Sequence, residues 1–153
     1  MSASVTMQLL AEILPTGTSV DPASVLIEEG ISPETTGFPA AVVTCPQTEQ
    51  ADVTFGDTQD TYTIQVLLLD RWDSSARSLE AISGGLRATL ERMRANVNAN
   101  RGLPSGGVDT VMSQPVRMRI TLEGPVQDDS LGFPIVSGTL QIVLKSVYYQ
   151  IGG

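Results

Sequence analysis

The clearest pattern in the sequence is the alternation of hydrophobic and polar residues in two runs near its end, 115–124 and 133–150. An alternation with a period of two is typical of a β-strand with one buried and one exposed face. In the first run, Met118 falls on the side opposite Arg117 and Arg119. The sequence therefore predicts two long strands that form a hairpin, joined by the acidic eight-residue segment between them.

Three earlier runs also predict strands. In 61–70, one face is hydrophobic throughout and the other turns apolar at Leu67, so we expect this strand to end buried on both sides. Residues 39–45 predict a shorter strand that Pro46 closes, and residues 51–55 predict another.

Two segments have helical spacing. Residues 2–14 predict a first helix, and residues 78–97 predict a longer one whose hydrophobic residues recur every three or four positions. Gly84 and Gly85 lie inside the longer helix, where each costs up to about 1 kcal/mol relative to alanine. We interpret them as a sign that the helix approaches the sheet closely or bends there. A functional hinge is the alternative.

The predicted order is a helix, two or three short strands, a long strand, a second helix and two long strands. This order predicts an α+β fold in one domain spanning residues 1–153. We expect a mostly antiparallel sheet of four to five strands, with the main helix packed across it and the N-terminal helix as the second one. Residues 24–29 are compatible with a strand or a helical turn, because so short a run has no decisive period.

Composition argues against several classes of function. The chain has 153 residues and a net charge of −8, whereas a protein that neutralises phosphate groups needs a basic surface. General nucleic-acid binding is therefore disfavoured. No apolar run approaches the roughly 20 residues needed to cross a bilayer, and the first residues lack the pattern of a signal peptide. We expect no membrane partner.

Residues suited to catalysis or metal binding are scarce. Histidine, the commonest general base and zinc ligand, does not occur. The single cysteine, Cys45, has no disulfide partner in the chain and is predicted to be a small buried residue. Three aspartate pairs lie where solvated acids are common: Asp57 with Asp60, Asp70 with Asp73, and Asp128 with Asp129. We predict no catalytic residue, no metal and no cofactor, and hence no enzyme.

The remaining candidates are surface residues that could contact a partner. Arg117 and Arg119 lie two positions apart on the outward face of a predicted strand and could dock an acidic partner; a solvated strand face is the alternative. Asp128 and Asp129 lie in the predicted acidic loop.

A hydrophobic stripe in the last strand is a further candidate. Val143, Val147 and Tyr149 fall on the side opposite Leu144, on the second face of the sheet. If the N-terminal helix does not cover this stripe, we expect the stripe to be an oligomerisation surface.

The order of these elements resembles the tail terminator, or tail-completion, proteins of long-tailed bacteriophages. The similarity lies in the N-terminal helix, the hairpin VTFGDTQDTYTIQVLLLDR, the helix SLEAISGGLRATLERMRANV and a closing pair of long strands that ends in aromatic residues. The similarity covers most of the chain in size, in the order of elements and in the general pattern of residues, and it includes no diagnostic motif. The segment 15–39 and the acidic loop fit the family less closely.

The resemblance implies a virion structural protein, assembled in the host cytoplasm, that forms a six-fold ring. Such a ring caps the tail tube and provides a docking surface for the head–tail connector, so the implied partners are further copies of the chain, the tube protein and the connector protein. Genomic DNA would be passing cargo, which the negative charge of the ring repels. Two alternatives stay open: a phage neck or head-completion connector, and a general α+β ligand-binding domain or histidine-free enzyme.

Overall fold

The computed structural model describes residues 3–28, 37–54, 57–72, 78–100, 114–128 and 133–149. The helices in these residues are α1 (Ala3–Ile13), the short 3-10 helix η1 (Pro22–Ser24) and α2 (Leu79–Ala99). The strands are β1 (Val25–Ile27), β2 (Ala40–Thr54), β3 (Asp57–Arg71), β4 (Gln114–Asp128) and β5 (Phe133–Tyr149).

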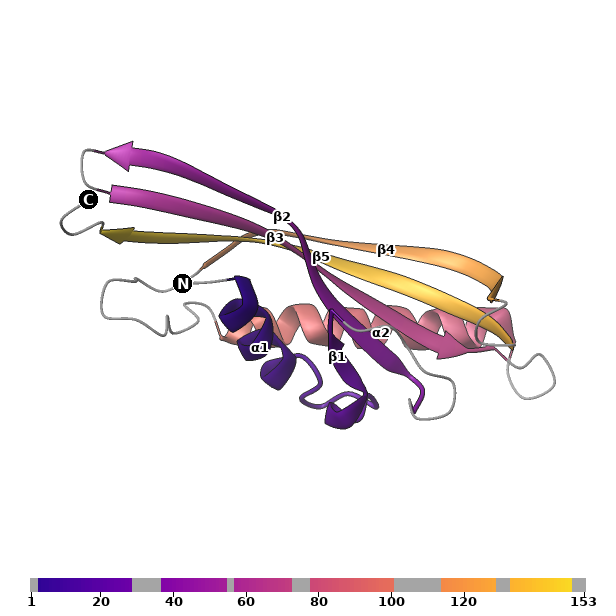
Figure 1. Cartoon of the computed structure of the whole chain (residues 1–153). Coiled ribbons are helices and arrows are strands. Elements are labelled where there is room, and N and C mark those ends of the chain that lie inside the picture. The colour runs from indigo at the N-terminus through magenta and orange to yellow at the C-terminus, as the bar shows by residue number, and fades with distance from the viewer. Residues whose placement is uncertain are drawn as a thin grey trace.

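The strands form one mixed sheet in the order β1-β2-β3-β5-β4. β1 runs parallel to β2, and the other three neighbouring pairs are antiparallel. Both α-helices lie against the same face of the sheet (Figure 1). The predicted α+β fold with a mostly antiparallel sheet is confirmed, and the ambiguous segment 24–29 contains strand β1.

The hydrophobic core lies between the helices and this covered face of the sheet. Alternate residues of β3 and β5 point into it, as the period of two predicted, and α2 contributes the seam of residues spaced three and four apart. Full burial of one such side chain contributes roughly 1.5–3 kcal/mol, so this layer is the main source of stability. Its largest fully buried members are Leu10, Leu14, Ile64, Leu68, Ile82, Leu90, Met93, Leu140, Ile142 and Leu144.

The second face of β3 is more open than we expected. Leu69 is buried, because it packs with Ile135 and Phe38 in a small separate cluster. Leu67, which we predicted to be buried, is 36% exposed. The reason is that both described helices lie against the opposite face.

Prolines disturb the strand pairing without ending the strands. The prediction that Pro46 closes a short strand is wrong, since β2 runs on to Thr54 as one strand of 15 residues. Its register with β3 shifts between Thr44 and Gln47, which marks a β-bulge. A bulge at a free edge tolerates a residue that has no backbone N–H to donate.

The acidic loop between β4 and β5 is shorter than predicted. β4 continues to Asp128, which pairs with Phe133 at the start of β5. Half of the predicted loop is therefore strand, and Asp129 lies outside the described residues.

The glycine that brings helix and sheet together is Gly138 of β5. A Cβ atom there would lie 2.6 Å from Leu90 Cδ1 of α2 and 2.8 Å from Leu122 Cδ2 of β4. Gly84 and Gly85, which we interpreted as this contact, are exposed, and a Cβ atom at either would meet nothing within 4 Å. Close approach of the helix to the sheet at these two glycines is therefore wrong.

A buried amide joins the two helices. Asn96 of α2 is 7% exposed, and its Nδ2 donates to the carbonyl oxygens of Leu14 at 3.0 Å and Thr16 at 2.8 Å. These carbonyls follow the end of α1 and lack helical partners of their own. Asn96 therefore ties the end of α1 to α2.

Replacing Gly138 with alanine is expected to destabilise the protein by about 1–3 kcal/mol, because the new methyl group overpacks the contact with Leu90. The matched control is Gly84→Ala in the open helix face, which we expect to raise stability by about 0.5–1 kcal/mol. Urea unfolding monitored by circular dichroism measures both. Equal effects at the two sites would contradict the assignment of Gly138 as the contact glycine.

Asn96→Ala is expected to cost about 1–3 kcal/mol of unfolding free energy, because two carbonyl groups lose their donor in a buried setting. Arg94→Ala, on the exposed side of the same helix, serves as the control and should change stability by less than about 0.5 kcal/mol. Thermal unfolding of the two variants side by side checks the difference.

Candidate interaction surface

The described helices leave the second face of the sheet uncovered. Residues on this open face alternate with core residues along each strand, and the register aligns them in rows across the sheet. One row joins Thr44, Gln65, Gln141 and Arg119; the next joins Gln47, Thr63, Val143 and Arg117. The open face is therefore rich in neutral hydrogen-bonding side chains and ends in two arginines at β4.

Three of the predicted surface residues lie together on this face. Arg117 and Arg119 are exposed on β4, and Val143, half-buried on β5, is the register partner of Arg117. The exposed Lys145 lies two residues further along β5 on the same face. Neighbouring and diagonal positions in a sheet are about 5–8 Å apart, so three cations gather at the β4 side. The sequence analysis did not place Lys145 with the arginines, because the pairing of β4 with β5 sets this contact.

The other predicted residues lie at the two ends of the hairpin. Val147 and Tyr149 are register partners of Gln59 and Asp57, at the far end of β5. Asp128 is at the opposite end of β4. The structure therefore separates Asp128 from the arginines along the strand and does not bring the predicted residues into one site.

The sheet is longer than the helices that cover it. β5 has 17 residues, or about 55 Å at the usual strand rise, whereas the 21 residues of α2 span about 32 Å. The ends of β2, β3 and β5 run past the end of α2 (Figure 1). We call this part the sheet extension: residues 47–54, 57–63 and 143–149, paired from Gln47 with Thr63 to Thr54 with Asp57.

The sheet has two edges at which strands lack a described neighbour. β4 is 15 residues long, and no strand in the described chain pairs with its outer side. On β2, β1 pairs only with residues Ala41–Val43, so the rest of the strand forms a second edge. Residues 46–51 of that edge are all exposed.

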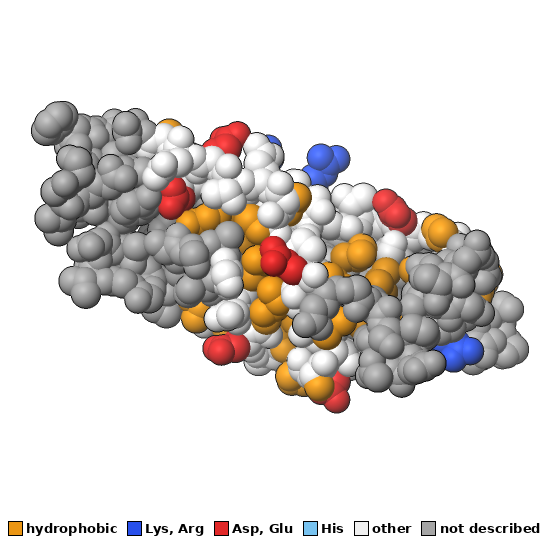
Figure 2. Space-filling model, viewed as in Figure 1, with side chains coloured by type: hydrophobic (Ala, Val, Ile, Leu, Met, Phe, Trp, Pro, Cys, Tyr) orange, Lys and Arg blue, Asp and Glu red, His pale blue; other side chains and the backbone are white. Residues whose placement is uncertain are grey.

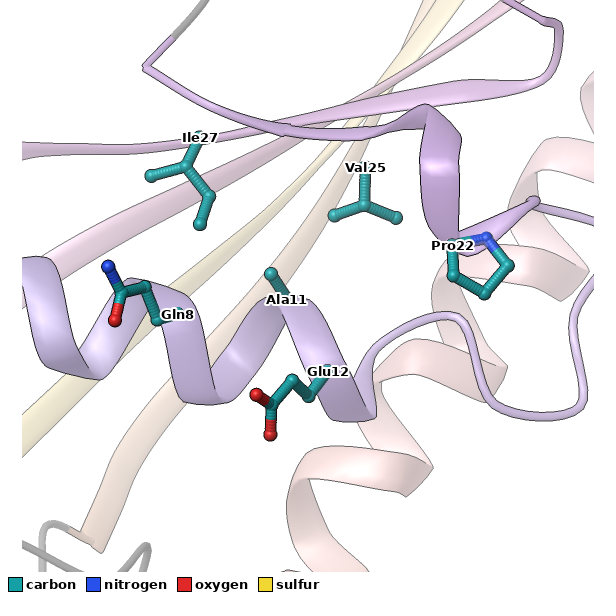
Figure 3. A pocket seen from close by; sticks show the side chains of 6 residues that line it. All are labelled: Gln8, Ala11, Glu12, Pro22, Val25 and Ile27. Carbon is teal, nitrogen blue, oxygen red and sulfur yellow. The ribbon is translucent and has the colours of Figure 1, made fainter.

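A shallow groove of about 500 Å³ lies between α1 and β1. Ala11, Pro22, Val25 and Ile27 line it, and Gln8 and Glu12 of α1 stand at its rim (Figure 3). Hydrophobic side chains gather over this part of the molecule among scattered acidic ones (Figure 2). The groove offers apolar contact and one carboxylate, without a cluster of groups suited to catalysis.

The described residues contain few groups arranged for chemistry. No three His, Cys, Asp or Glu side chains among them are grouped to hold a metal ion. The thiol of Cys45 is half-buried, 3.4 Å from the carbonyl oxygen of Gln47. The carboxylate of Asp60 is buried and accepts a hydrogen bond from the hydroxyl of Tyr62 at 3.2 Å. Each of these contacts is local to one strand.

Comparisons with known proteins add no family. No protein-family model matches the chain, and no curated protein matches it. No helix in the described part of the chain has the length and apolar character to cross a membrane.

If the basic side chains serve a partner and not the fold, their removal should leave stability unchanged. Arg117→Ala and Arg119→Ala are each expected to shift the free energy of unfolding by less than about 0.5 kcal/mol, since both residues are exposed. Ile142→Ala, on the core side of the neighbouring strand, should cost about 2–5 kcal/mol. Chemical unfolding of the three variants tests this, and a large loss at either arginine would assign it a structural role.

Proposed function

We propose that this protein is a structural subunit of a bacteriophage tail that assembles into a ring and caps the end of the tail tube. The observation that carries the proposal is the form of the sheet. The sheet is longer than the helices that cover it, one of its faces is open, and two of its edges lack a described neighbour over most of their length. Long open edges promote pairing with other chains unless they are covered. A subunit with two different edges is suited to head-to-tail assembly.

The proposal also draws on the resemblance in size and element order to tail terminator proteins. The helix-backed, mostly antiparallel sheet is compatible with that resemblance. Head-to-tail contacts use two different surfaces of each subunit and close into a ring when the rotation between copies divides a full turn. The open face and the far end of the sheet extension then remain available for the tube and for the connector.

Electron microscopy of the purified protein, alone and mixed with candidate tail tubes, tests the proposal. We expect ring-shaped particles, with added density at one end of each tube. Tubes without the protein are the control for that density. A protein that stays monomeric and never joins tubes contradicts the proposal. Binding to portal assemblies in place of tube ends would assign the protein to the neck.

A further inference from the structure

We propose that the free edge of β4 in one copy pairs with the free edge of β2 in the next copy, so that one sheet continues from subunit to subunit. This inference deepens the proposed function and rests on it in one respect, that the copies close into a ring. The partner is a second copy of this chain. The segments that meet are Arg117–Glu123 of β4 and Gln47–Asp52 of β2, which both lie between register shifts.

Each segment has the exposure expected of an unfilled pairing site. Residues 47–51 of β2 are all exposed, beyond the point where β1 stops pairing. In β4, the core-facing residues Met118, Ile120 and Leu122 remain half-exposed, although they pack against the core cluster. A neighbouring strand would bury these side chains and satisfy backbone groups along both edges.

The strand directions suit such a pair. β2 pairs antiparallel with β3, β3 with β5, and β5 with β4. Three such reversals make β4 run antiparallel to β2 within one subunit. A rotation about an axis tilted from the strands, as in a β-barrel, preserves these directions and staggers the register between neighbouring copies. The β4 strand of the next copy therefore arrives antiparallel to β2, the arrangement that accepts short, perpendicular hydrogen bonds.

Face matching, charge and the bounds of the two segments together favour the register that sets Arg119 opposite Glu49. Pairing must keep open-face residues opposite open-face residues, or every core side chain would turn to solvent. On that face, β4 presents Arg117 and Arg119, and β2 presents Glu49, whose carboxylate already accepts a hydrogen bond from Gln47 Nε2 at 2.8 Å. Within one chain, the two edges are three strand spacings apart, about 14 Å, so these charges meet only between copies.

A two-fold pair of β4 strands is the competing arrangement. Centred on Ile120, it would place Arg117 opposite Glu123 of the partner, which is also a favourable pair. It would leave the exposed edge of β2 unpaired, however, and would stop at a dimer. The head-to-tail arrangement uses both free edges.

Charge reversal separates the two arrangements. Sedimentation velocity should show that Arg119→Glu weakens self-association about tenfold or more, because like charges then lie opposite each other. Glu49→Arg should do the same. Either the double variant, or a mixture of the two single variants, should regain the self-association of the unmodified protein. Arg94→Glu, on the exposed side of α2, is the matched control and should have no effect.

A cross-link provides a second measurement. In a Cys45→Ser background, a chain carrying both Glu49→Cys and Arg119→Cys should form covalent species larger than dimers on oxidation. Each single-cysteine chain should stop at a dimer or stay monomeric. Circular dichroism confirms that the variants remain folded.

The outcomes distinguish this inference from the proposed function. If Arg119→Glu still forms rings on tubes, the edge pairing is wrong and the capping function stands. If the double variant shows no rescue, the edge pairing is wrong, and microscopy of the unmodified protein on tubes decides the capping function. If the edges pair as described but no tube is bound, the capping function is wrong and the pairing stands. An unmodified protein that stays monomeric at every concentration tested overturns the pairing.

Discussion

The contact between Leu90 of α2 and Gly138 of β5 is the constraint on which the architecture depends. The absence of a side chain at Gly138 lets the helix lie directly on the middle of the sheet, with Leu122 of β4 closing the contact from one side. Because α2 carries its hydrophobic residues along one seam, it can cover one face of the sheet only. α1 joins the same layer through the carbonyl groups that Asn96 holds. The other face is left open.

The length of the strands makes this one-sided packing leave a long uncovered surface. Strands β2, β3 and β5, of 15 to 17 residues, extend beyond the helices, so the sheet extension has no described helix beneath its far end. β1 protects only a short part of β2. Bulges and charged residues at the edges are devices that limit uncontrolled pairing, and the same charges can direct pairing with one partner.

Few of the described residues are arranged for catalysis or metal binding, whereas the sheet leaves one face and parts of two edges uncovered. The buried polar groups Asp60 and Asn96 are held by local or structural hydrogen bonds. The basic side chains of β4 and Lys145 share the open face, although the whole chain is strongly acidic. A local field can therefore differ in sign from the net charge, and a partner would respond to the local field.

The sequence by itself determined the type of most elements, because the periods of two and of three to four reflect backbone geometry. From these periods, the core faces of β3 and β5, the seam of α2 and the common face of Arg117, Arg119 and Val143 were predictable. The sequence could not show that β5 lies between β3 and β4, or that Lys145 therefore lies close to Arg117 and Arg119. It also assigned the helix–sheet contact to Gly84 and Gly85, and it ended a strand at Pro46. Only the tertiary structure decided these points, because strand order, edge position and the space beside a glycine depend on residues distant in the chain.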